Sequence, residues 1–122
     1  MTIELEIKDI YADTVNLRAW QPTNEEVDLR INLEIGVNNE VGINRFSFLL
    51  TTPEALLKRA SKGQESEDFL LVESRTLAIQ WYDWDLLVQH LKAIVTKCQD
   101  NFFEASCERL TRYFHWEYED YL

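Results

Sequence analysis

The segment from Val27 to Val37 alternates apolar and polar side chains with a period of two, which is the spacing of a β-strand. One face of this strand is aliphatic and carries Val27, Leu29, Ile31, Leu33, Ile35 and Val37. The other face is polar and carries Asp28, Arg30, Asn32 and Glu34. Strands that are apolar on one face only are typical of antiparallel sheets with a covered face and a solvated face. The chain is therefore expected to build such a sheet.

Neighbouring segments supply partners for this strand. Residues 3–8 alternate in the same way, and residues 43–50 carry Phe46, Phe48 and Leu50 at period two. Asn38, Asn39 and Gly42 between the two longer strands favour a hairpin connection, since Asn and Gly tolerate positive φ. We predict one or two further strands over 69–72 and 77–80, and a last strand over 115–122 that returns to the sheet.

Three segments carry helix signals. Thr52-Pro53-Glu54 is a helix start, and Gly63 a stop. Asp83 can cap a helix whose apolar stripe is Trp84, Leu87, Val88, Leu91, Ile94, Val95 and Cys98. Asn101 and Glu104 have the spacing of a capping box for a third helix. The sequence thus predicts a single α+β domain over 1–122, with a mostly antiparallel sheet and about three helices packed on one face.

Residues with catalytic or ligand-binding chemistry are scattered. His90 and His115 stand 25 positions apart, and Cys98 and Cys107 form no C-x-x-C pair. We expect reduced, buried thiols, with a single disulfide as the alternative. The three glycines form no phosphate-binding loop. We predict that the chain is not an enzyme and takes no metal or cofactor; a small hydrolase with an unrecognised carboxylate site is the weakest alternative.

Twenty-two carboxylates against twelve Lys and Arg give the chain a net charge of −10. Such a field disfavours nucleic acid and anionic membranes and attracts basic partners, although acidity also serves solubility alone. No signal peptide or bilayer-spanning run is present, so we expect a cytoplasmic protein. Tyrosine supplies rigid contact area and carboxylates steer cations. The candidate partner-binding residues are Glu65, Glu67, Asp68, Asp83, Glu117, Tyr118, Glu119, Asp120 and Tyr121.

The order of these features resembles the Immunity protein 8 family of bacterial polymorphic toxin systems, which include contact-dependent growth inhibition. The resemblance is carried by the strands and turn from Leu29 to Leu50, the Thr52-Pro53 helix start, Tyr82-Asp83 before the amphipathic helix, and the ending Trp116-Glu117-Tyr118-Glu119-Asp120-Tyr121. It implies a protein that neutralises the C-terminal toxin domain delivered by sibling cells. Such toxins are commonly nucleases, which are basic because they bind phosphates. The alternative is a generic acidic adaptor domain with no toxin partner.

Overall fold

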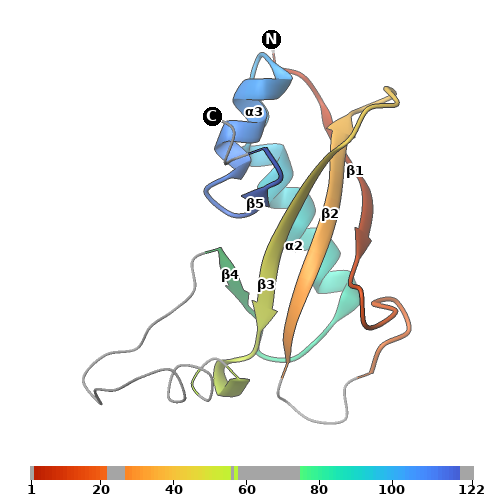
Figure 1. Cartoon of the computed structure of the whole chain (residues 1–122), viewed down its shortest axis with the longest axis vertical. Coiled ribbons are helices and arrows are strands. Elements are labelled where there is room, and N and C mark those ends of the chain that lie inside the picture. The colour runs from red at the N-terminus through yellow and green to blue at the C-terminus, as the bar shows by residue number, and fades with distance from the viewer. Residues whose placement is uncertain (1, 22–26, 56, 58–74, 119–122) are drawn as a thin grey trace, which may run out of the picture.

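The computed structural model describes residues 2–21, 27–55, 57 and 75–118, and it confirms the α+β class (Figure 1). The sheet has five strands in the order β1-β2-β3-β4, with β5 pairing with β3 off this path. The strands are β1 (Leu5–Tyr11), β2 (Asp28–Val37), β3 (Asn44–Thr51), β4 (Thr76–Ala78) and β5 (His115–Trp116). The helices that follow β4 are α2 (Trp84–Lys97) and α3 (Phe103–Leu110). Pairing is antiparallel except between β3 and β4, which is parallel.

The β2–β3 hairpin forms in the register that its alternation predicts. Leu33 pairs with Phe46 and Ile31 with Phe48, so the apolar side chains of both strands point to one face. These four side chains are at most 2% exposed. Asn39 in the connecting turn has a φ of 66°, as expected for an asparagine in a hairpin turn. Local pattern and turn chemistry therefore agree in fixing the register.

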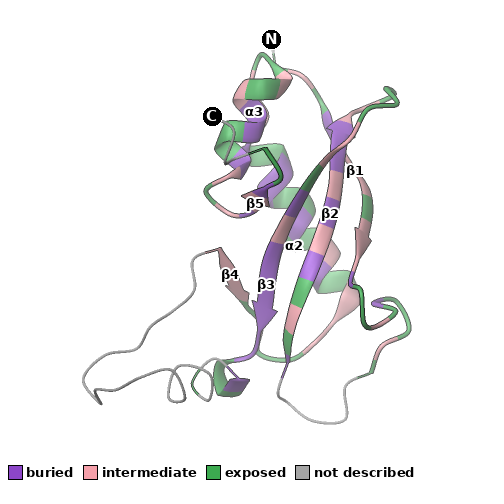
Figure 2. Ribbon diagram, in the orientation of Figure 1, coloured by how far each residue is buried: buried purple, intermediate pink, exposed green. Residues whose placement is uncertain are grey.

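Helices α2 and α3 cover this apolar face of the sheet (Figures 1 and 2). The expected cap of α2 is confirmed, because the Asp83 side chain accepts a hydrogen bond from the Leu86 N–H at 3.1 Å. The stripe of α2 that faces the core carries the buried residues Leu87, Leu91, Ile94 and Val95. The helix is thus held on the sheet by an apolar stripe at helical spacing.

An aromatic cluster joins the end of the chain to the sheet. Phe114 lies 5.4 Å from Phe48 and 6.5 Å from Phe46, measured between ring centroids. Strand β5 then pairs with β3, and Trp116 stacks on Phe46 at 6.2 Å. The Trp116 indole N–H donates to Asn44 Oδ1 at 2.9 Å, which satisfies its one polar group. The cluster fixes residues 114–116 against β3.

The capping box predicted for α3 is wrong. The N-cap of α3 is Phe102, which makes no side-chain cap hydrogen bond. Instead Ser106, buried in the first turns, accepts the Asp100 N–H at 2.8 Å and donates to the Phe102 carbonyl at 3.0 Å. The Asn101 N–H is taken by Asp100 Oδ1 at 2.6 Å. The Asn101 N–H, which the Glu104 side chain of a capping box would accept, is therefore satisfied by the preceding residue instead.

Other sequence-based boundaries differ in detail. Within the last predicted strand, residues 115–116 pair with β3, Glu117 and Tyr118 form a turn, and residues 119–122 lie outside the described residues. The helix after Thr52 begins at Pro53 as predicted, and residues 53–55 and 57 are helical. Strand β4 matches the start of the segment expected at 77–80, whereas the strand expected at 69–72 and the helix stop at Gly63 lie outside the described residues.

Candidate partner-binding surface

The sheet face opposite α2 and α3 carries the polar side chains of β1, β2 and β3, and no described helix covers it (Figure 1). Asp9 on β1 pairs with Glu34 on β2, and Glu34 pairs with Arg45 on β3. Directly paired residues point to the same face, so these three side chains form a row across the strands. Glu117 extends the row, because its backbone N–H donates to the Arg45 carbonyl at 3.0 Å. We call Asp9, Glu34, Arg45 and Glu117 the acidic row.

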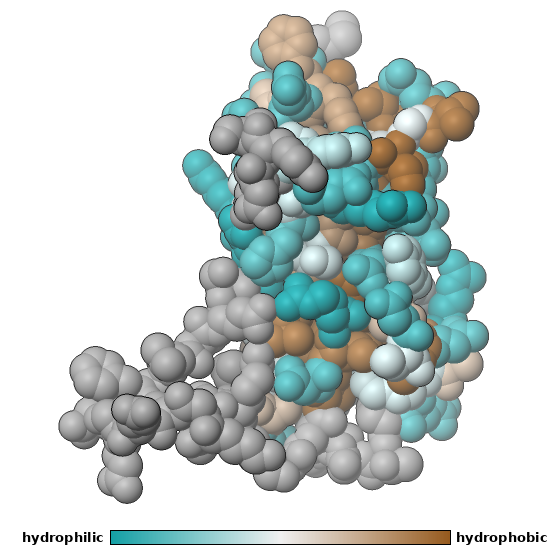
Figure 3. Space-filling view, viewed as in Figure 1, coloured by the Kyte–Doolittle hydropathy of each residue, from teal (hydrophilic) through white to brown (hydrophobic). Residues whose placement is uncertain are grey.

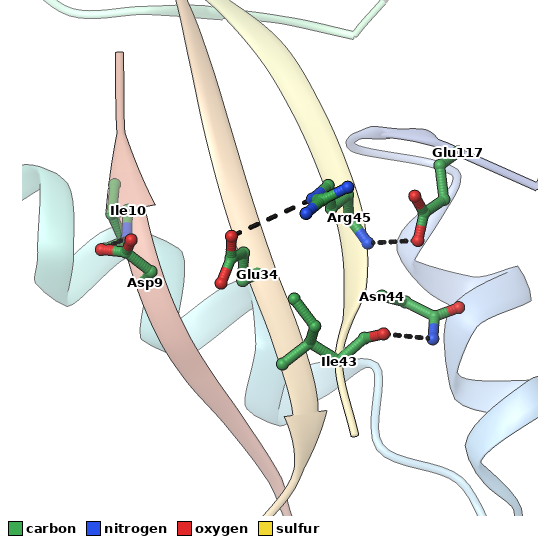
Figure 4. A network of polar contacts seen from close by, with 7 residues as sticks. All are labelled: Asp9, Ile10, Glu34, Ile43, Asn44, Arg45 and Glu117. Carbon is green, nitrogen blue, oxygen red and sulfur yellow. Dashed lines mark hydrogen bonds and ion pairs between the residues drawn. The ribbon is translucent and has the colours of Figure 1, made fainter. Parts of the chain in front are cut away.

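Hydrogen bonds hold the acidic row in place (Figure 4). The Arg45 N–H donates to Glu117 Oε1 at 2.9 Å, which ties the turn after β5 to β3. The Ile10 N–H donates to Asp9 Oδ1 at 2.9 Å, next to the irregularity in the β1–β2 register. Arg45 Nε lies 4.0 Å from Glu34 Oε2, at the limit of an ion pair. Backbone contacts therefore position two of the three carboxylates before any partner binds.

The charges of the row do not cancel. Three carboxylates face one guanidinium, which leaves a formal charge of −2 on these four residues. The Arg45 side chain is 62% exposed, so its ion pair with Glu34 is screened by water and worth no more than about 1 kcal/mol. In the space-filling view, hydrophilic side chains form a band across the middle of this face, with hydrophobic residues at the upper right (Figure 3). The row therefore presents negative charge to an approaching protein.

Two of the residues predicted to bind a partner, Glu117 and Tyr118, lie at one end of the acidic row. The Tyr118 side chain is 48% exposed, and its ring stands edge-on to Trp116 with centroids 5.9 Å apart. Trp116 is itself buried, so it provides a fixed base for the tyrosine. A half-exposed aromatic ring beside a carboxylate is a common composition for protein interfaces.

Asp83 does not join this group. Its carboxylate caps α2, and α2 starts at the end of the sheet away from β5 (Figure 1). The structural role found for Asp83 does not by itself place it at an interface. The remaining predicted contact residues lie outside the described residues: Glu65, Glu67, Asp68, Glu119, Asp120 and Tyr121.

Sequence reasoning did not select Asp9 and Arg45 as site residues, and it placed Glu34 only on the polar face of its strand. The available signal was the alternation of the two strands, which places both Glu34 and Arg45 on the polar face of the sheet. Asp9 could not be aligned in this way, because the β1–β2 register shifts between Ile7 and Asp9. Pairing between distant segments decided this part of the surface.

The thiols are buried away from the acidic row. Cys98 and Cys107 are free, and their side chains are 2% and 0% exposed. Burial raises the pKa of both thiols, and burial together with Glu104 and Glu108 raises that of Cys107 to about 12. Neither thiol is activated as a nucleophile, since activation requires a lowered pKa.

The histidines are also separate from each other in the structure. His90 lies exposed on α2, whereas His115 lies in β5 with its Nδ1 2.8 Å from Arg75 Nη1. Within the described ranges, no group of three or more His, Cys, Asp or Glu side chains is arranged to hold a metal ion. None of the helices in those ranges has both the length and the apolar character required to span a bilayer.

Comparison with known proteins adds one finding. No curated protein and no solved structure matches the chain significantly. A family model described as Immunity protein 8 matches residues 5–121, which include all five strands and both described helices. Because this match covers nearly the whole chain, the protein belongs to the Immunity protein 8 family.

Proposed function

We propose that this immunity protein binds and neutralises a basic, nuclease-type toxin domain, and that the acidic row contributes to the contact. Family membership implies a toxin as the partner. The observation that supports a basic partner is charge: the chain carries −10, and the acidic row holds three carboxylates and one guanidinium on the uncovered sheet face, which also carries Asp28 and Arg30. Membership in an immunity-protein family also supports an inhibitor that acts by binding, without catalysis of its own.

A physical argument connects this charge to inhibition. A nuclease concentrates Lys and Arg where it binds the phosphates of its substrate. A protein that presents carboxylates at that site competes with the substrate and also speeds its own association by long-range attraction. Backbone hydrogen bonds and strand pairing already restrict the side chains of Asp9, Glu34 and Glu117 in the free protein. These side chains therefore lose little conformational entropy on binding.

Co-expression tests the function directly. The toxin domain to use is the C-terminal domain of the large secreted protein that we expect the neighbouring upstream gene to encode. Cells that express this domain with the immunity protein should grow, and cells that express the domain alone should die. Purified immunity protein should also stop nucleic-acid cleavage by the domain at a one-to-one ratio. Equal killing with and without this protein would show that the chain does not neutralise that toxin, as the adaptor alternative requires.

Matched charge variants test the acidic row. Asp9→Asn, Glu34→Gln and Glu117→Gln together remove three charges and keep the acceptor oxygens that bind Ile10 and Arg45. The control removes three exposed carboxylates elsewhere: Asp13→Asn, Glu40→Gln and Glu54→Gln. We expect the row variant to lower the association rate constant about tenfold and to flatten its dependence on salt. Equal effects of the two triple variants would show that only net charge matters.

A further inference from the structure

An apolar pocket opens between β4 and the first turns of α2, on the side of the sheet that the helices cover. Its volume is about 290 Å³. The described side chains that line it come from both elements: Leu77, Ala78, Ile79, Leu86, Leu87 and His90. Pockets that bury a whole small molecule usually occupy about 300–1,000 Å³, so this one has the size for one or two protein side chains.

Two large apolar residues beside the pocket are exposed. Leu86, which lines it, is 51% exposed. Trp81 is 59% exposed and lies in the connection from β4 to α2, which joins the two walls of the pocket. Single exposed apolar residues are ordinary, but an exposed leucine in the wall of an apolar pocket, with an exposed tryptophan two positions after the lining residue Ile79, has the composition of an interface hot spot.

The connection that carries Trp81 is held rigidly by its neighbour. The Tyr82 hydroxyl donates to the Leu17 carbonyl at 2.5 Å, and the Tyr82 ring packs on Trp20 with centroids 4.8 Å apart. Tyr82 is therefore anchored on the loop that follows β1, while Trp81 is left at the surface. A tryptophan on a fixed backbone loses little conformational entropy on binding.

Charge next to the pocket indicates which partner fits it. The Asp83 carboxylate lies beside the backbone of Leu86, because it accepts a hydrogen bond from the Leu86 N–H at 3.1 Å. Asp85 is exposed on the same turn. These two full negative charges outweigh the roughly half positive charge of the helix N-terminus together with the one positive charge of Arg18, whose guanidinium carbon lies 5.7 Å from the centroid of the Trp84 ring. Among the described lining residues there is no Lys or Arg. The surroundings thus complement a segment that carries both an apolar and a basic side chain.

We propose that the pocket between β4 and α2 receives an apolar side chain of the toxin domain, flanked by a Lys or Arg that faces Asp83 and Asp85. This inference rests on the proposed function, because it takes the toxin as the partner. The pocket then supplies the apolar anchor of the complex, whereas the acidic row supplies electrostatic steering. The two contributions differ in kinetics: loss of a buried anchor raises the dissociation rate, and loss of peripheral charge lowers the association rate.

The test measures binding of the purified toxin domain to full-length variants. Trp81→Ala and Leu86→Ala remove the exposed side chains, and Ala78→Phe places a ring in the pocket. The matched controls are Phe102→Ala and Val41→Ala, which truncate apolar side chains that are 71% and 99% exposed elsewhere. We expect each pocket variant to raise Kd about 30-fold or more through faster dissociation, with an unchanged dependence on salt. The controls should stay within about twofold of the parent protein.

The outcomes separate this inference from the proposed function. If the parent protein neutralises the toxin domain and the folded pocket variants do so with unchanged Kd, the pocket inference is wrong and the function stands. If the parent protein does not bind the domain, both fail. The alternative occupant of the pocket is a second copy of this chain, and light scattering of the free protein tests it. If the parent protein is a dimer and the Trp81→Ala variant is a monomer, the pocket binds a second copy and the inference is wrong. Circular dichroism measures whether each variant is folded. Leu86→Ser replaces any variant that is not folded.

Discussion

Replacement of Thr52 by valine isolates one buried hydrogen bond between the start of β2 and the end of β3. The Val27 N–H donates to Thr52 Oγ1 at 3.0 Å, and the Thr52 N–H donates back to the Val27 carbonyl at 2.9 Å. Val27 is 1% exposed and Thr52 0% exposed, so water cannot take the place of a missing partner. Valine has nearly the shape of threonine but no acceptor oxygen. The Thr52→Val variant therefore leaves the Val27 N–H buried without its acceptor.

The expected cost follows from that single loss. An unsatisfied buried donor costs about 1–3 kcal/mol, so we expect the free energy of unfolding to fall by about 2 kcal/mol. This corresponds to an equilibrium constant about 30-fold smaller. Thr52→Ser keeps the oxygen and loses one methyl group, which costs about 0.8 kcal/mol.

Urea unfolding followed by tryptophan fluorescence measures both variants. The order of stability should be parent, then Thr52→Ser, then Thr52→Val, with the same dependence on urea concentration in all three. A valine variant at least as stable as the serine variant would refute the reasoning, because valine retains more apolar volume and differs unfavourably only in the lost acceptor. An altered urea dependence would instead indicate a change in the denatured state.

Two further predictions concern stability. A Cβ atom at Gly36 would lie 2.1 Å from the Gly42 carbonyl oxygen, whereas a Cβ atom at Gly42 would have nothing within 4 Å. Gly36→Ala should therefore lower the free energy of unfolding, measured in urea, by about 1–3 kcal/mol, and Gly42→Ala should be close to neutral. The raised pKa values of Cys107 and Tyr82, each about 12, predict a loss of stability in alkali. Unfolded Cys107 loses its proton near pH 9 and the folded thiol only near 12, so its contribution is fully present below pH 9 and declines by about 1.4 kcal/mol per pH unit above it. Unfolding curves at pH 7 to 11 should show this slope, and Cys107→Ala should reduce it; a slope unchanged by that substitution would exclude Cys107 as its source.

The proposed interface combines two kinds of contact that act at different stages of binding. The acidic row lies on the uncovered face of the sheet, and the apolar pocket lies between β4 and α2 on the covered side. A partner that contacts both must therefore reach around the edge of the sheet at β4. Kinetic measurements on the two sets of variants, in the same buffer, would show whether their effects on binding add, as expected for separate sites.

Local sequence determined the elements whose signals are complete within a few residues. Alternation predicted β2 and β3, and the Asn39 turn joined them, because period two and positive φ are properties of the segment itself. Asp83 predicted the start of α2 for the same reason, since a cap and its N–H lie three residues apart. The apolar stripe of α2 then predicted which of its faces would be buried.

Only the tertiary structure decided which distant segments meet. Glu117 reaches Arg45, 72 positions away, because β5 pairs with β3, and no local pattern contains that separation. The capping box at Asn101 failed because Ser106 turned inward and took the loop hydrogen bonds, a choice made by burial. The pocket likewise joins β4 to α2, a contact that the pattern of neither segment indicates. Periodicity is encoded residue by residue, whereas a surface depends on long-range pairing and on what that pairing leaves uncovered.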